Sequence, residues 1–263
     1  MIPKIIHYCW FGGNPLPDLA VKCIESWKQF FPDYEIKEWN ESNFDVNMVP
    51  YTAEAYTAKK FAFVSDYARF WILYQYGGIY FDTDVEVIKS MDDILDEGPF
   101  MGYEHDLTTH YLNGAINPGL GFACEPHMSI VKTLLERYNR LHFCVNGNLN
   151  LKTIVAYTTE IFLDNGLEIK DGIQQCCGFT IYPPDYFNPL NDKIHMIEKT
   201  ENTRLIHHYI ASWGSKSWIK LIYRFLKYRM LLPVLPKMLV EKIVKNNKVK
   251  NDKKINSRFI DNE

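Results

Sequence analysis

Two aspartates, Asp82 and Asp84, carry the clearest chemistry in this chain of 263 residues. They follow residues 79–81, an apolar and β-prone run that is typical of a strand buried on both faces. Residues two apart in a strand point to the same side. Two carboxylates held together attract a hard divalent cation, which binds oxygen ligands. The pattern predicts a metal site at a strand end, where ligands usually bind in α/β sheets.

The segment before these aspartates is predicted to be an amphipathic helix that approaches the site. Its aromatic residues recur at spacings of three and four, and Gly77 and Gly78 stop it. Asp66 and Arg69 lie three residues apart, so they share one face of this helix. They form either a solvated surface ion pair or a pair that belongs to the site, and the glycine-controlled approach to the aspartates favours the second interpretation.

The remaining chain predicts alternating strands and helices. Residues 4–10 and 34–39 are predicted strands, and residues 17–31 are a predicted helix between them. This alternation indicates a mostly parallel α/β sheet. Near the other end, residues 204–208 are apolar enough to form a strand that ends in two histidines. The proline-marked residues 171–193 are predicted to be loop and short strand.

Three pieces of the sequence resemble one family. They are IPKIIHYCWFGG at 2–13, SDYARFWILYQYGGIYFDTDVEV at 65–87 and HHYIASW at 207–213. The chain resembles the family 32 glycosyltransferases, which carry a sugar-binding region containing a DXD motif. The resemblance implies a GT-A-like α/β fold, with a mixed, mostly parallel sheet flanked by helices, as a catalytic domain over residues 1–214.

The resemblance also implies the site. Asp84 would bind the metal, and Asp82 would bind the ribose and approach the metal. A late histidine would be the third ligand. His208 fits best, and His207 is the alternative because neighbouring strand residues face opposite ways. Histidine with carboxylates suits Mn²⁺ better than Mg²⁺. Further residues would bind the nucleotide sugar: His7, Trp10, Asp66, Arg69, Tyr80, Asn113, Ser212 and Trp213. For His7 and Trp10, burial in the core with a satisfied imidazole is an equal alternative.

The activity implied by the resemblance is metal-dependent, retaining transfer of a hexose from a nucleotide sugar to a cell-surface polysaccharide of the capsular type. We expect a UDP-linked donor carrying galactose, glucose or an N-acetyl derivative, with GDP-mannose as the alternative. No nucleophile can be assigned, so a front-face mechanism is the default. A non-catalytic carbohydrate-binding protein is the alternative of another class. A phosphatase with an Asp nucleophile is disfavoured because VEVI, rather than a glycine- or threonine-rich turn, follows the motif.

Charge is spread unevenly along the chain. The net charge is −3, yet residues 214–263 hold 13 Lys/Arg against 4 Asp/Glu. In the extension at 215–263, apolar residues recur at helical spacing between cations. This pattern predicts peripheral membrane association through residues 215–250, with packing on the catalytic body as the alternative. The glycan acceptor is then expected to be lipid-linked, and no nucleic-acid partner is expected.

The cysteines and the N-terminal residues indicate the cellular compartment in which the protein is expected. No pair of the six cysteines has zinc-ligand spacing, and Cys176 and Cys177 are adjacent. Residues 1–10 do not have the pattern of a signal peptide, and no run approaches the ~20 apolar residues of a membrane span. We therefore expect free thiols in a reducing cytoplasm, with the protein at the inner face of the membrane.

Overall fold

The computed structural model describes most of the chain. It describes residues 1–104, 115–168, 170–191 and 196–209. Three predicted site residues, Asn113, Ser212 and Trp213, lie outside the described residues. The basic extension at 215–263 also lies outside them, so its helices and its boundary stay predictions.

The chain divides into two compact units. The first comprises Met1–Pro189 and Lys199–Trp213, and the second comprises Leu190–Glu198 and Gly214–Glu263. In the second unit, the described strands β12 (Leu190–Asn191) and β13 (Met196–Ile197) pair antiparallel. All the predicted site residues that the structure describes belong to the first unit.

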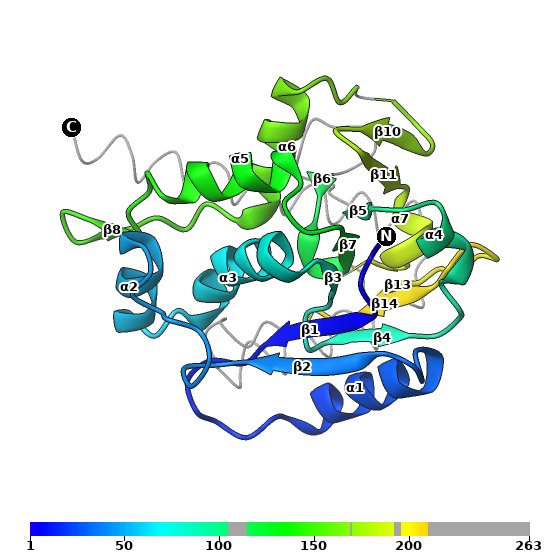
Figure 1. Cartoon of the computed structure of the whole chain (residues 1–263), viewed down its shortest axis with the longest axis horizontal. Helices are drawn as coiled ribbons and strands as arrows, with labels where there is room; N and C mark the ends of the chain where they lie inside the picture. Colours follow the sequence, from blue (N-terminus) through cyan, green and yellow to red (C-terminus); the bar gives the residue numbers. More distant parts are fainter. Residues whose placement is uncertain (105–114, 169, 192–195, 210–263) are drawn as a thin grey trace. The chain divides into compact units, whose positions relative to one another are not determined.

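A mixed sheet of eight strands lies at the centre of the first unit (Figure 1). The strand order is β10-β11-β5-β7-β3-β1-β2, and β6 pairs with β5. Five strands (β1, β2, β3, β5 and β11) run in one direction, and β6, β7 and β10 run in the other. The predicted mixed, mostly parallel sheet is confirmed. The strands are β1 (Ile5–Cys9), β2 (Glu35–Trp39), β3 (Gly78–Tyr80), β5 (Phe100–Glu104), β6 (Ala115–Ile116), β7 (Phe122–Cys124), β10 (Gln174–Cys176) and β11 (Phe179–Tyr182).

Helices cover both faces of this sheet, so the predicted GT-A-like α/β class is confirmed in its architecture. One hydrophobic core joins α2, α3, α5 and α6 to the sheet, and the other joins α1, α4 and α7 to it. Strand β1 alternates between them, with Cys9 in the first core and Ile6 and Tyr8 in the second. The helices are α1 (Asp18–Phe30), α2 (Pro50–Thr57), α3 (Phe61–Tyr76), α4 (Asp92–Asp96), α5 (Ser129–Tyr138), α6 (Ile154–Asp164) and α7 (Pro184–Phe187).

Two further strand pairs lie outside the large sheet. Strand β4 (Val85–Val87) pairs antiparallel with β14 (Leu205–His207), and β8 (Cys144–Val145) pairs with β9 (Asn148–Leu149). A turn separates β3 from β4, and β4 takes a partner from near the end of the first unit.

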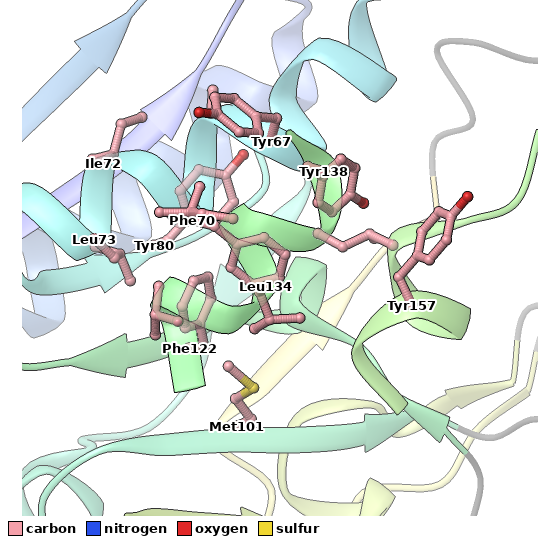
Figure 2. Close-up of a cluster of buried hydrophobic side chains, with 14 of the residues drawn as sticks. Tyr67, Phe70, Ile72, Leu73, Tyr80, Met101, Phe122, Leu134, Tyr138 and Tyr157 are labelled. Carbon is pink, nitrogen blue, oxygen red and sulfur yellow. The ribbon is translucent and has the colours of Figure 1, made fainter. Parts of the chain in front are cut away.

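Helix α3 carries the aromatic face that its sequence spacing predicts. Tyr67, Phe70 and Leu73 are buried and pack in one cluster with Leu134 and Tyr138 of α5 (Figure 2). Much of the aromatic content of the chain therefore fills this core. None of the helices in the described ranges has the length and apolar character needed to cross a bilayer.

Two glycines end α3 and start β3. Gly77 has φ +63° and donates its N–H to the carbonyl of Leu73 at 2.9 Å, and Gly78 has φ +98°. Side-chain-bearing residues rarely adopt these conformations. A Cβ on Gly78 would also lie within 3.0 Å of the carbonyl oxygen of Ile5. The glycine pair therefore lets the chain turn sharply from the helix into a strand beside β1.

Candidate active site

The two aspartates lie in the turn between β3 and β4. The N–H of Val85 donates to the carbonyl of Asp82 at 3.0 Å, which closes the turn. The sequence placed Asp82 and Asp84 on one side because strand residues alternate. The structure brings their carboxylates to one side through the turn instead. Both side chains are partly buried, as expected for groups that face a ligand from the edge of a core.

His207 completes a cluster with these aspartates. Its Nε2 lies 3.3 Å from Asp84 Oδ1 and 3.8 Å from Asp82 Oδ2. One ligand atom from each of the three residues lies within 4.8 Å of the others. Among the described residues, this is the single group of at least three such side chains close enough to share a metal ion.

His208, the histidine preferred from the sequence, lies elsewhere. Its Nε2 is 2.9 Å from Glu86 Oε2, and its backbone N–H donates to the carbonyl of Asp84 at 3.0 Å. Strand β14 pairs with β4 so that His207 stands opposite Val85. Because neighbouring strand residues face opposite sides, this register turns His207 toward the aspartates and His208 away. The geometry therefore favours the alternative ligand, His207.

The charges of this cluster and its neighbours shift the protonation equilibria of His207 and Asp82. Burial alone would lower the pKa of His207, but the Asp84 and Asp82 carboxylates outweigh it and raise that pKa. Burial would raise the pKa of Asp82, but Arg69 and His207 outweigh it and lower that pKa. The cluster therefore holds anionic oxygens beside an imidazole, which is a donor set suited to a divalent transition metal such as Mn²⁺.

The hydrogen bond on the other ring nitrogen of His207 bears on metal binding. Nδ1 accepts the backbone N–H of Tyr209 at 3.2 Å. In a neutral imidazole the proton then lies on Nε2, which faces Asp84. A cation on Nε2 would require the proton to move to Nδ1 and this hydrogen bond to open. The donor set therefore fits a metal, with a local adjustment at Tyr209, whose φ of +49° lies in the left-handed region.

Asp66 and Arg69 form a buried ion pair that reaches the aspartates. Arg69 Nη2 donates to Asp66 Oδ1 at 3.0 Å, and Arg69 Nη1 donates to Asp82 Oδ2 at 3.4 Å. Both side chains are nearly inaccessible, so the surface-pair interpretation is wrong. Burial raises the pKa of Asp66 to about 7, although Arg69 opposes the shift. One guanidinium thus contacts two carboxylates, Asp66 on α3 and Asp82 in the turn after β3.

Tyr80 adds a second contact to Asp82. Its hydroxyl donates to Asp82 Oδ1 at 3.1 Å, and the Arg69 guanidinium lies 4.8 Å from the centre of its ring. Stacking on the ring and the hydrogen bond from Arg69 Nε to the Ser65 carbonyl fix the plane of the guanidinium. Asp82 is therefore held by Tyr80 and Arg69.

A turn after β6, in a stretch rich in glycine and asparagine, lies against Asp82. Asn117 Oδ1 accepts the N–H of Gly119 at 2.7 Å and begins the short 3₁₀ helix Pro118–Leu120. A Cβ on Gly119 would lie within 3.0 Å of Asp82 Oδ2 and 3.2 Å from Arg69 Nη1. The absence of a side chain at Gly119 therefore makes room for the carboxylate.

His7 and Trp10 do not join the cluster through their side chains. His7 is 1% exposed. Its Nδ1 accepts the indole N–H of Trp39 at 3.0 Å, so Nε2 carries the proton and donates to the carbonyl of Gly77 at 3.1 Å. Burial lowers the pKa of His7 to about 4. The satisfied-ring alternative therefore describes His7, and the indole of Trp10 donates to the carbonyl of Asn14.

A family model matches the residues around this site. Residues 17–101 match the family model described as "Glycosyltransferase sugar-binding region containing DXD motif". This match contains the Asp66–Arg69 pair, Tyr80 and both aspartates. Within residues 17–101, the chain is similar to the DXD-motif glycosyltransferases. The clustered Asp82 and Asp84 have the spacing of a DXD motif inside this match, and the match ends before His207.

Curated relatives of this chain include proteins named as mannosyltransferases. Inositol phosphoceramide mannosyltransferase 3 of Schizosaccharomyces pombe is 29% identical over 166 residues, 62% of this chain and 44% of that protein. An uncharacterized glycosyltransferase of Acanthamoeba polyphaga mimivirus is 34% identical over 128 residues, 44% of this chain and 49% of that protein. The chain spans less than half the length of the curated relatives it matches.

Solved glycosyltransferases also align with the structure at low identity. One involved in the glycosylation of the major capsid of PBCV-1 aligns with a TM-score of 0.45 and 13% identity, over 78% of this chain and 93% of that chain. The PaToxG glycosyltransferase aligns with a TM-score of 0.47 and 18% identity, over 62% of this chain and 69% of that chain.

Proposed function

We propose that this chain is a metal-dependent glycosyltransferase that moves a hexose, with retained anomeric configuration, from a nucleotide sugar to a glycan acceptor. The observation that carries the proposal is the convergence of Asp82, Asp84 and His207 within 4.8 Å, with two of the three inside the matched sugar-binding region. Two carboxylates and an imidazole at one strand end form a site for a diphosphate with its metal.

The residues of the cluster and its neighbours would have separate roles in group transfer. Asp82, Asp84 and His207 would hold Mn²⁺ or Mg²⁺, which supplies Lewis-acid stabilisation of the leaving diphosphate. Arg69 adds a fixed positive charge beside Asp82. Asp66 would bind hydroxyls of the donor sugar next to Arg69. The retained configuration is what the family resemblance implies. A front-face attack, in which the leaving phosphate takes the proton of the acceptor, is the default because no nucleophile can be assigned.

Two donors remain candidates. The sequence expectation was a UDP-linked hexose, namely galactose, glucose or an N-acetyl derivative. Three of the relatives are named as mannosyltransferases, so GDP-mannose is supported at least as well. Those names also mention inositol phosphoceramide, which is a lipid, and this supports the proposal that the acceptor glycan is carried on lipid. A capsular or other cell-surface polysaccharide is the acceptor class expected from the resemblance.

A panel of nucleotide sugars tests the proposal. Calorimetry and donor hydrolysis would be measured for UDP-galactose, UDP-glucose, UDP-N-acetylglucosamine and GDP-mannose, with Mn²⁺, with Mg²⁺ and with chelator. We expect one donor to bind and turn over in a metal-dependent way. Asp84→Asn and His207→Ala should each abolish both responses without unfolding, whereas the matched control His208→Ala should keep them. Binding without any turnover or transfer would favour a carbohydrate-binding protein instead.

We also propose that residues 215–250 bring the protein to the inner face of the membrane. The support is the sequence pattern of apolar residues between cations in the extension. Flotation with anionic vesicles at low salt would be compared for the full chain and for a charge-reversal variant, Lys220→Glu with Arg224→Glu and Lys227→Glu. We expect only the unmodified chain to float, and to be released by salt. Equal flotation of both, or none, would refute this proposal.

A further inference from the structure

Two adjacent thiols converge at the turn between β10 and β11. Cys176 ends β10 and pairs with Phe179 of β11, so Cys177 and Gly178 form a two-residue turn. Both turn residues have φ in the left-handed region, +54° and +81°, as a type I′ hairpin requires. Asparagine, aspartate and glycine are the usual residues in such a turn, and cysteine is uncommon there. In this conformation the two Sγ atoms lie 3.4 Å apart.

One backbone carbonyl faces both thiols. The carbonyl oxygen of Asn165 lies 3.6 Å from Cys177 Sγ and 3.8 Å from Cys176 Sγ. A point equidistant from these three atoms lies about 2.1 Å from each, close to the ~2.3 Å of a Zn–S bond and the ~2.0–2.2 Å of a Zn–O bond. Two sulfur atoms and one oxygen atom are therefore already spaced as the ligands of one cation would be.

The position of this carbonyl favours a cation. Helix α6 ends at Asp164, and Asn165 is its C-cap. Carbonyl groups at the C-terminus of a helix lie at the negative end of the helix dipole, where cations are stabilised. Cys177 is partly exposed and Asn165 is exposed. A cation can therefore enter from solvent, and water can complete its coordination.

A disulfide fits this pair of cysteines less well than a shared cation does. Adjacent Cα atoms lie about 3.8 Å apart across a trans peptide bond, which is below the ~4.4–6.8 Å usual for disulfide-linked residues. The spacing of the cysteines in the sequence predicts no zinc site, because the third donor is a backbone carbonyl that lies 11 residues before Cys176. The fold of the hairpin against α6 brings that carbonyl to the thiols.

We propose that Cys176, Cys177 and the Asn165 carbonyl bind a thiophilic divalent cation of the Zn²⁺ and Cd²⁺ class. Thiolates are preferred by such metals, whereas Mn²⁺ and Mg²⁺ prefer oxygen ligands. On binding, each thiol gives its proton to solvent and two metal–sulfur bonds form, with no change in oxidation state. The bound cation would link the β10–β11 turn to the end of α6. This site shares no residue with the DXD cluster and does not depend on the proposed function.

Titration of the reduced full chain with Cd²⁺ tests the site. The ultraviolet charge-transfer absorption of Cd²⁺ bound to thiolate reports sulfur ligation, and carboxylates do not give it. We expect wild type to bind one equivalent of Cd²⁺ with this absorption. Cys177→Ser should weaken that binding at least 10-fold, because it removes one of the two thiolates. Cys144→Ser is the matched control and should keep wild-type affinity, because Cys144 is an exposed cysteine on the β8–β9 hairpin.

Two further measurements separate this site from the DXD cluster and from misfolding. Asp84→Asn should keep the sulfur absorption, because the aspartates are not ligands of this site. Cd²⁺ should raise the thermal midpoint of Asp84→Asn, and the rise should be lost when Cys177→Ser is added to it; the midpoints without metal show that both variants fold.

Four results would each overturn the assignment. They are wild-type affinity in Cys177→Ser, equal loss of affinity in Cys144→Ser, loss of the sulfur absorption in Asp84→Asn, and no sulfur absorption in wild type.

Discussion

Replacing Gly119 by alanine tests whether close contact beneath Asp82 sets the geometry of the site. The added Cβ would lie within 3.0 Å of Asp82 Oδ2 and 2.9 Å from Asn117 Oδ1. Ordinary contacts of a Cβ begin near 3.4 Å. The Asp82 carboxylate would therefore have to move by several tenths of an ångström, up to about 1 Å, the scale at which misplaced catalytic groups lose about 100-fold in rate.

That displacement would disturb both the contact of Asp82 with Arg69 and its place in the cluster with Asp84 and His207. The carboxylate would leave the hydrogen bond from Arg69, now 3.4 Å, and the cluster with Asp84 and His207. We expect Gly119→Ala to lower metal-dependent turnover about 100-fold, which corresponds to about 2.7 kcal/mol in activation free energy. Overpacking should also lower the free energy of unfolding by about 1–3 kcal/mol.

Gly102→Ala provides a control of the same chemical kind. Its Cβ would meet the ring of Phe187 in the core on the other face of the sheet. We expect Gly102→Ala to lose stability by urea titration while its folded fraction keeps Mn²⁺-dependent nucleotide binding in the calorimeter. If Gly119→Ala binds metal and nucleotide as wild type does, then contact beneath Asp82 does not control the site and the steric reasoning is wrong.

Two further predictions concern buried polar groups. Because burial lowers the pKa of His7 to about 4 from 6.5, the unfolded chain binds the proton more readily between these values. The free energy of unfolding that depends on a neutral His7 ring should be fully present above pH 6.5 and should fall by about 3 kcal/mol as the pH drops through 4. In urea titrations, the difference in stability between wild type and His7→Gln should therefore change only in this pH window. Tyr138→Phe removes a buried hydroxyl that has no hydrogen-bond partner among the residues that the structure describes. Thermal unfolding should show unchanged or slightly raised stability, and a loss above about 1 kcal/mol would mean that the hydroxyl is hydrogen-bonded in solution.

The local part of the site was predictable from the sequence. Helix α3, its glycine stop, strand β3 and the DXD turn lie within contiguous residues, and each carries its own signal in spacing or residue type. The pairing of Asp66 with Arg69 follows from helical geometry alone. Their burial does not, because it depends on what the rest of the chain packs over them.

The non-local part was not predictable. Whether His207 or His208 faces the aspartates depends on the register of β14 against β4, and a shift of one residue would exchange them. For His7, the sequence could not decide between a ligand and a satisfied core residue, since Trp39 and Gly77 meet it through the sheet and the glycine turn.

The pairing of β4 with β14 has a consequence for how the protein is made. The contact between Glu86 and His208 joins residues 122 positions apart, and His207 reaches Asp84 through the same strand pair. Closing so long a loop is slow compared with forming α3 or the glycine turn. On the ribosome, the DXD turn therefore emerges long before its histidine. The proposed cation site is incomplete until the chain has been synthesised past β14, so under that proposal metal binding would mark the completion of folding of this unit.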